Sequence, residues 1–187
     1  MAELTSQLTS GARADKPAPS ASPETVVLQR VQGAIGKPIV IKTARGMSHF
    51  GEHSIGWFAI GVLGALRDKP RRKEWLTASA GAVAAHAASI AVKRVVRRKR
   101  PNDPNVAVHV GTPSKLSFPS SHATSTTAAA VLFSTMTGRK LVPVLVPPML
   151  VSRLVLGVHY PTDVIAGAGL GALVGGLVRR KLRRSGS

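Results

Sequence analysis

Cysteine is absent from this chain, and acidic and aromatic residues are scarce. Without cysteine, neither disulfides nor cysteine-ligated zinc sites can form. Aromatic residues make up only 4% of the 187 residues, too few for the stacking platforms that bind single-stranded nucleic acid. Residues 1–23 contain no long apolar run, so no signal peptide is expected.

Positive charge dominates, because 26 Lys/Arg against 8 Asp/Glu give a net charge of +18. Such a balance is typical of proteins that bind nucleic acid, an anionic membrane surface or an anionic substrate. The mean hydropathy of +0.13 is too high for a soluble basic nucleic-acid binder. We therefore expect no nucleic-acid partner, and a membrane bilayer and an anionic ligand instead.

The length is typical of one domain, and its flanks differ from its centre in composition. The first residues are rich in Ala, Ser, Thr and Pro, which predicts a disordered tail. Val27, Val31 and Ile35 then recur every four residues, which predicts an amphipathic helix on the membrane surface. We predict a disordered tail, an interfacial helix, a membrane-embedded domain and a basic C-terminal tail: 1–23, 24–46, 47–178 and 179–187.

Five apolar segments form the central part, each near the ~17–25 residues of a membrane helix: 48–66, 75–92, 121–138, 141–158 and 163–178. Small residues in them, including a stripe of Gly167, Gly171 and Gly175, favour close helix packing. The predicted fold is all-α, a polytopic membrane bundle of about five transmembrane helices plus the interfacial helix. A soluble helical bundle is the alternative, and the basic clusters between the apolar segments count against it.

Lys93 and Arg100 belong to a basic run that ends at Pro101. Seven positions apart on a helix, they would share one face and could hold a phosphate from two sides. The alternative is a patch facing lipid headgroups, which is the role expected for the rest of the run: Arg94, Arg97, Arg98 and Lys99.

Pro119, Ser120, Ser121 and His122 begin the third apolar segment. Pro and Ser favour a helix N-terminus, where free N–H groups and the helix dipole attract anions. The hydroxyls can add donors, and His122 can give or take a proton. The alternative is a helix cap with an incidental histidine.

Arg153 lies in an apolar segment, where a charge is costly unless it meets a partner such as a phosphate. His159 follows, and Asp163, the only Asp or Glu after Asp103, comes four residues later. The carboxylate can hold one ring nitrogen and leave the other as a nucleophile. The alternative is a structural His–Asp pair beside an arginine that reaches the membrane surface.

Together the three clusters resemble the motifs of the type 2 phosphatidic acid phosphatase family, which vanadium haloperoxidases and bacterial acid phosphatases share. The motifs Lys-x6-Arg-Pro, Pro-Ser-Gly-His and Ser-Arg-x5-His-x3-Asp match in this order: Lys93, Arg100 and Pro101; Pro119, Ser120, Ser121 and His122; Ser152, Arg153, His159 and Asp163. Ser121 departs from the pattern, since the family usually has glycine there.

The resemblance implies a phosphatase that needs no metal and no cofactor. His159 would attack phosphorus and form a phosphohistidine, Asp163 would orient it, and His122 would protonate the leaving alcohol and then activate water. The phosphoryl oxygens would be held by the other motif residues: Lys93, Arg100, Ser120, Ser121 and Arg153. The sequence agrees, because it has no carboxylate cluster for Mg²⁺ or Zn²⁺.

The resemblance also implies a phosphomonoester on a membrane lipid of polyprenyl or diacylglycerol type. Size and basicity resemble small actinobacterial lipid phosphatases, so decaprenylphosphoryl-5-phosphoribose, used for arabinan in the cell wall, is one candidate. Polyprenyl diphosphate, phosphatidic acid and phosphatidylglycerol phosphate are alternatives. A basic membrane scaffold that binds anionic lipid is the non-enzyme alternative, and the spacing of the three clusters counts against it.

Four histidines lie outside the motifs. We expect His86 to pack within its helix, and His49 and His53, near Glu52, to lie at the membrane interface, with a metal pair as the alternative. His109 lies in the loop beside the predicted site, where it could touch a headgroup.

The expected location is the inner (plasma) membrane. In short segments opposite the three clusters, 12 Lys/Arg favour that face as cytoplasmic, which puts the site outside the cytoplasm. The 46-residue N-terminal segment would then have to cross the membrane, which counts against this orientation.

Overall fold

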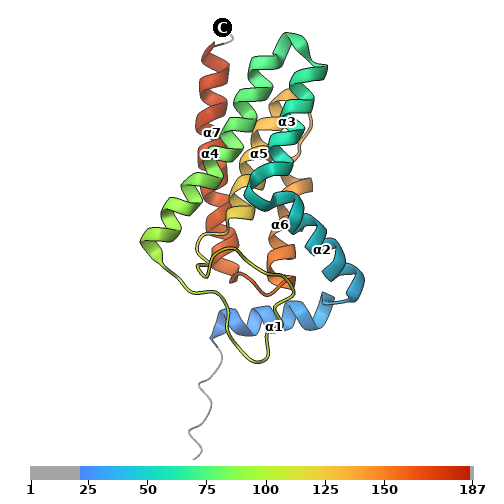
Figure 1. The fold of residues 1–187 in the computed structure, drawn as a ribbon, viewed down its shortest axis with the longest axis vertical. Coiled ribbons are helices and arrows are strands. Elements are labelled where there is room, and N and C mark those ends of the chain that lie inside the picture. Colours follow the sequence, from blue (N-terminus) through green and yellow to red (C-terminus); the bar gives the residue numbers. More distant parts are fainter. Residues whose placement is uncertain (1–21, 186–187) are drawn as a thin grey trace, which may run out of the picture.

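The computed structural model describes residues 22–185, and this part of the chain is helical apart from its loops (Figure 1). No strand occurs in it, and its one isolated β-bridge joins Lys99 to Leu116. The all-α prediction is confirmed. The described residues form these elements: α1 (Pro23–Ile35), α2 (Pro38–Gly51), η1 (Glu52–Ser54), α3 (Ile55–Arg67), η2 (Lys69–Arg71), α4 (Arg72–Val96), α5 (Ser121–Thr137), α6 (Val142–Val155) and α7 (Pro161–Ser185).

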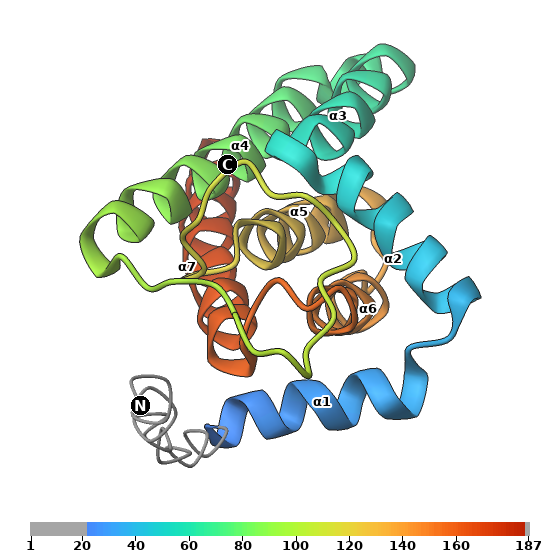
Figure 2. The same cartoon turned by 60° about the horizontal axis from the view of Figure 1, so that its bottom comes forward.

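Helix α5 lies at the centre of the bundle, with the other helices around it (Figure 2). Most of its residues are buried, although many are Ser and Thr. Their hydroxyls can return hydrogen bonds to their own helix, as Thr124 Oγ1 does to the main-chain oxygen of Ser120 at 2.9 Å. Small side chains of this kind let neighbouring helices approach closely.

Helix α7 packs on α5 through the predicted glycine stripe. A Cβ at Gly175 would lie 3.2 Å from Cα of Ala128, and one at Gly167 would lie 2.6 Å from the main-chain oxygen of Ser120. The predicted close-packing face is therefore confirmed, and it fixes the start of α7 beside the start of α5.

Two helical stretches of the described chain are long and apolar enough to cross a membrane, Lys69–Val96 and Pro161–Arg184. Helix α6 is apolar but shorter. All five predicted apolar segments contain a helix, but α3, α5 and α6 have only 13, 17 and 14 residues. The number of five spans stays a prediction.

Three predicted boundaries differ from the structure. The segment 24–46 is not one helix, because α1 ends before Gly36, and Pro38, which has no N–H to donate, begins α2. Helix α2 runs past residue 46, and α7 continues through most of the predicted C-terminal tail. Nearly all of the predicted tail 1–23 lies outside the described residues.

Helix α1 and the long loop 97–120 lie at the end of the bundle opposite the C-terminus of α7 (Figure 1). At the C-terminal end, the α3–α4 turn meets the end of α5, where Arg71 Nη1 donates to the main-chain oxygen of Met136 at 3.0 Å. The short basic segments and the three motif clusters therefore lie at opposite ends of the molecule.

Candidate active site

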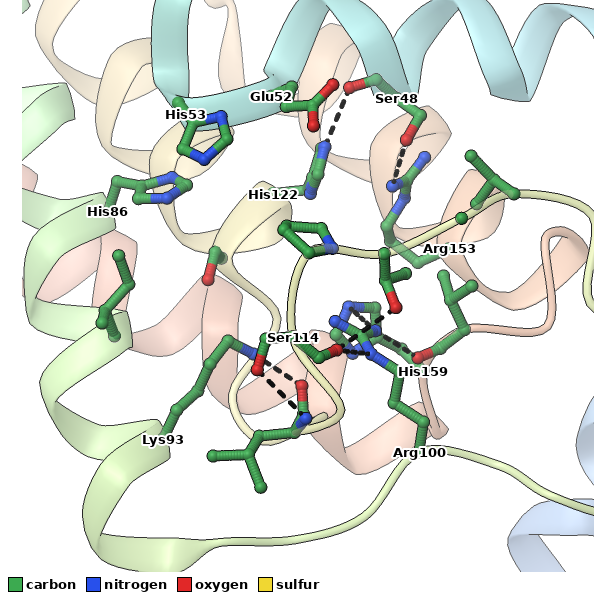
Figure 3. A pocket seen from close by; sticks show the side chains of 18 of the residues that line it. Ser48, Glu52, His53, His86, Lys93, Arg100, Ser114, His122, Arg153 and His159 are labelled. Atoms are coloured by element: carbon green, nitrogen blue, oxygen red, sulfur yellow. Dashed lines mark hydrogen bonds between the residues drawn. The ribbon is translucent and has the colours of Figure 1, made fainter.

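A cavity of about 530 Å³ lies where the loop 97–120 folds over the start of α5 (Figure 3). Its walls come from α2, η1, α4, α5, α6, this loop and the segment 156–160 before α7. Among the described residues that line it, Glu52 has the one carboxylate, against four cationic side chains: Lys93, Arg94, Arg100 and Arg153. The cavity is therefore suited to an anion.

His159 is buried between a carboxylate and a guanidinium. Its Nδ1 lies 3.5 Å from Oδ2 of Asp163, and its Nε2 lies 3.2 Å from Nη1 of Arg100. A guanidinium can only donate, so Nε2 accepts and the ring proton is on Nδ1, on the side of Asp163. Within residues 22–185 Nδ1 has no hydrogen-bond partner, so its contact with Asp163 is electrostatic.

Burial lowers the pKa of His159 to about 3, and the nearby cations act in the same direction. The ring is therefore neutral at physiological pH. A neutral imidazole with an unprotonated Nε2 is the form that attacks phosphorus. The pairing of His159 with Asp163 that the sequence predicts is present.

The Asp163 carboxylate is fully buried and held on both sides. Its Oδ2 accepts from the main-chain N of Tyr160 at 2.8 Å, and its Oδ1 accepts from Arg98 Nη1 at 2.9 Å. Its main-chain oxygen accepts from the N–H of Ser120 at 2.9 Å. The second and third clusters, far apart in the sequence, are thus tied together at one point.

Arg98 was expected to face lipid headgroups, and this prediction is wrong. Besides Asp163, its guanidinium contacts Glu24 and the hydroxyl of Thr162, and it lies 4.2 Å from the ring centre of Tyr160. Burial acts to lower the pKa of Arg98, but the hydrogen bond with Glu24 and the charge of Asp163 raise it. The sequence signal for this contact is the scarcity of acidic residues. With only 8 Asp and Glu in the chain, each is a candidate partner for an arginine such as Arg98.

The predicted helix from Lys93 to Arg100 is also wrong. Helix α4 ends at Val96, and Arg97 adopts a left-handed conformation with φ of 55°. Arg100 precedes Pro101, a position that disfavours helix. Both predicted cations still line the cavity, Lys93 from the helix and Arg100 from the loop.

Main-chain carbonyls hold these two cations in place. Lys93 Nζ donates to the oxygen of Pro119 at 2.6 Å. Arg100 donates to the oxygens of Ser114 at 2.8 Å and Val158 at 2.7 Å. Burial lowers the pKa of Arg100 to about 10, which leaves it cationic at neutral pH. The same bonds fix the loop 97–120 against α4 and the segment 156–160.

Helix α2 positions His122 and Arg153, and the sequence did not predict this role of α2. His122 Nε2 lies 2.9 Å from the main-chain oxygen of Ser48. A carbonyl only accepts, so Nε2 carries the proton and Nδ1 is the nitrogen that can take up another. Arg153 Nη1 donates to the hydroxyl of Ser48 at 3.0 Å. Gly51 leaves room for the imidazole, because a Cβ there would lie 2.7 Å from Cδ2 of His122.

The two serines of the second cluster differ. Ser120 is buried as the N-cap of α5, where its hydroxyl accepts from the N–H of Ala123, and it is not part of the cavity wall. Ser121 lines the cavity, and its hydroxyl lies 2.7 Å from that of Ser89. Direct phosphate contacts by either serine stay predictions.

Histidines outside the motifs also reach the cavity. His86, expected to pack within its helix, lines it together with His53, and their ring centres are 6.0 Å apart. Glu52 and His49 also line the cavity, whereas His109 is not part of the wall. In the part of the chain that the structure describes, no three His, Asp or Glu side chains gather to hold a metal ion.

Comparison with known proteins identifies relatives over most of the chain. A model of the PAP2 superfamily matches residues 74–187. The decaprenylphosphoryl-5-phosphoribose phosphatase of Mycobacterium tuberculosis (strain H37Rv) is 57% identical over 156 residues, which cover 83% of this chain and 88% of the relative. The phosphatase of the same name from Mycolicibacterium smegmatis is 60% identical over 145 residues, 77% of this chain and 81% of the relative.

Two solved structures share the fold. A transmembrane PAP2-type phosphatidylglycerolphosphate phosphatase from Bacillus subtilis has a TM-score of 0.69 at 21% identity, covering 88% of this chain and 89% of its own. Aquifex aeolicus LpxE has a TM-score of 0.63 at 18% identity, covering 86% of this chain and 97% of its own. Both likenesses show the membrane helical fold.

Proposed function

Because the chain belongs to the PAP2 superfamily and is a membrane lipid phosphatase, we propose that it removes the 5-phosphate of decaprenylphosphoryl-5-phosphoribose. The names of the two mycobacterial relatives support this substrate. The observation that carries the mechanism is His159, neutral and buried, between Asp163 and Arg100 on the wall of a cationic cavity.

In the first step, Nε2 of His159 attacks phosphorus, and the bond from phosphorus to the ribose 5-oxygen breaks. The imidazole becomes cationic, and Asp163 beside Nδ1 stabilises that charge. His122 takes up a second proton on Nδ1 when the anionic phosphate binds beside it, and gives this proton to the leaving oxygen. The products are a phosphohistidine and a lipid-linked ribose.

In the second step, His122 takes a proton from water, and the resulting hydroxide attacks the phosphohistidine. The bond to Nε2 breaks, which restores the neutral imidazole and releases inorganic phosphate. The cations Lys93, Arg100 and Arg153 stabilise the phosphoryl oxygens in both steps and supply the charge that metals supply elsewhere. We also assign supporting contacts with the phosphate to Ser120 and Ser121, which lie at the start of α5.

Phosphate release by the purified protein tests this function. We expect turnover of decaprenylphosphoryl-5-phosphoribose in excess EDTA, inhibition by vanadate, and a loss of roughly 10²- to 10⁴-fold for His122→Ala. Activity that disappears in EDTA and returns with Mg²⁺ would contradict the metal-free mechanism. Faster release from phosphatidic acid or from a polyprenyl diphosphate would contradict the substrate.

We also propose that the protein lies in the plasma membrane with the cavity outside the cytoplasm. Short basic segments at the end opposite the cavity support this orientation. The cysteine-free chain allows a direct test by single substitutions in the site loop and the α5–α6 turn. In intact cells, a membrane-impermeant maleimide should label Thr112→Cys and not Lys140→Cys, and the reverse pattern would invert the orientation.

A further inference from the structure

The cavity has a second end that the proposed chemistry does not use. Four of its lining residues come from the corner between α2 and α3 and from the middle of α4: His49, Glu52, His53 and His86. Figure 3 shows the rings of His53 and His86 side by side. At about 530 Å³ the cavity lies in the range, roughly 300–1,000 Å³, that holds a small molecule rather than one phosphoryl group.

One polar atom at this end has no partner among the described residues, although Glu52 pairs with His49 at 3.9 Å. Within residues 22–185, Nδ1 of His86 is buried without a hydrogen bond. His53 and Ser54 both adopt left-handed backbone conformations, with φ of 50° and 62°. Such strain in residues other than glycine gathers at ligand sites, where the rest of the fold maintains it. A buried, unpartnered nitrogen and a strained corner therefore indicate that a ligand completes this end.

Helix α4 gives the order of groups along the cavity. Lys93 and His86 are seven residues apart on one helix, which separates them by two turns, about 10 Å along the axis. Lys93 lies at the phosphate end, so His86 lies about 10 Å further toward the C-terminal end of the bundle. Some substrates carry their reactive phosphate far from the lipid tail. In such a substrate, the chemical group next to the phosphate would lie between Lys93 and His86.

The donor and acceptor set is suited to hydroxyl groups. A carboxylate such as that of Glu52 can accept from two neighbouring hydroxyls, and a neutral imidazole offers one donor and one acceptor. A second phosphate, as in a polyprenyl diphosphate, would be repelled by the carboxylate. An apolar alcohol would leave the buried Nδ1 of His86 unpaired, which disfavours its binding.

We propose that Glu52, His53 and His86 form a subsite for the sugar hydroxyls of the lipid substrate, next to the phosphate site. This inference rests on the proposed function and adds which residues select the headgroup. Glu52 binds two ring hydroxyls, while His53 and His86 take up the remaining donor and acceptor positions. The subsite selects a phosphorylated sugar over a phosphate joined directly to the lipid.

Two lipids and three variants test the subsite. The lipids are decaprenylphosphoryl-5-phosphoribose and decaprenyl phosphate, and the variants are Glu52→Gln, His86→Gln and, as the control outside the cavity wall, His109→Gln. We expect the first two variants to lower kcat/KM for the sugar lipid by about tenfold or more and for decaprenyl phosphate by less than about twofold. The control should change neither.

Retained turnover of decaprenyl phosphate shows that a variant is folded. An equal loss on both lipids, or no loss on either, would overturn the subsite. A binding experiment separates this failure from that of the proposed function. Calorimetry compares the His159→Ala variant with the double variant His159→Ala, Glu52→Gln. The double variant should bind ribose 5-phosphate about tenfold more weakly and inorganic phosphate with the same affinity. Equal affinities of the two variants for ribose 5-phosphate would overturn the subsite. Failure of the wild type to hydrolyse either lipid would instead refute the proposed function.

Discussion

The two oxygens of Asp163 face different parts of the molecule. On the cavity side, Oδ2 lies 3.5 Å from Nδ1 of His159. On the outer side, Oδ1 accepts from Arg98 at 2.9 Å, and Arg98 in turn pairs with Glu24 of α1. The cavity side is made by the bundle itself, whereas the outer side depends on the first helix.

The contact of Asp163 with His159 takes part in the proposed reaction, whereas its contact with Arg98, which pairs with Glu24, only holds the carboxylate in place. The cavity side lies within the residues that match the PAP2 superfamily, 74–187, and Glu24 lies outside them. Asp163 is fully buried, while the side chains of Arg98 and Glu24 are 29% and 28% exposed. Partly exposed ion pairs contribute less than buried ones, so effects should decrease from His159 outward to Glu24.

The largest effect is expected at His159. Replacement by Ala removes the nitrogen that attacks phosphorus, so phosphate release should fall on the order of 10⁴- to 10⁶-fold. His109→Ala, a histidine outside the cavity wall, is the control and should keep wild-type turnover. Substantial turnover by a folded His159→Ala protein, judged by gel filtration in detergent, would remove His159 from its role.

Asp163→Asn should be the next most severe change. The amide can keep the hydrogen bond from Tyr160 N, but the charge that stabilises the imidazolium is lost. We expect kcat to fall roughly 10²- to 10⁴-fold with little change in KM, measured by phosphate release. A loss confined to KM would indicate that Asp163 acts on substrate binding instead of on His159.

The cavity side could be predicted from the sequence, and the outer side could not. His159 and Asp163 are four residues apart, so their contact follows from local spacing. Glu24 and Asp163 meet through Arg98 only because α1 folds against the start of α7, a tertiary contact with no local pattern. Arg100 illustrates a third case, because it reaches the predicted place by a loop and not by the predicted helix.

Arg98→Met should have an intermediate effect. It leaves the buried Asp163 without a charged hydrogen bond worth about 1.5–3 kcal/mol, which corresponds to roughly 10- to 100-fold in kcat. Arg98→Lys should recover part of the loss, since it restores the charge without the forked geometry. These rate constants come from steady-state phosphate release.

The neighbouring exposed Arg97→Met is the matched control for this prediction, with an expected change below about twofold. A purely structural role of Arg98 would lower the amount of folded protein and leave kcat per folded molecule unchanged. That result would contradict the positioning role.

The smallest effect is expected for Glu24→Gln. The pair of Glu24 with Arg98 is partly exposed, and such pairs contribute up to about 1 kcal/mol, which limits the loss in kcat to about fivefold. Gln can still accept from Thr162, so the contact of α1 with α7 should persist. Glu74→Gln, in the first turn of α4 far from the site, is the control. If Glu24 influences catalysis through Arg98 and Gln keeps the contact with Thr162, the double variant Glu24→Gln, Arg98→Met should be no slower than Arg98→Met alone. An additive loss would mean that Glu24 reaches the active site by another route, and the outer side of Asp163 would then have two independent supports.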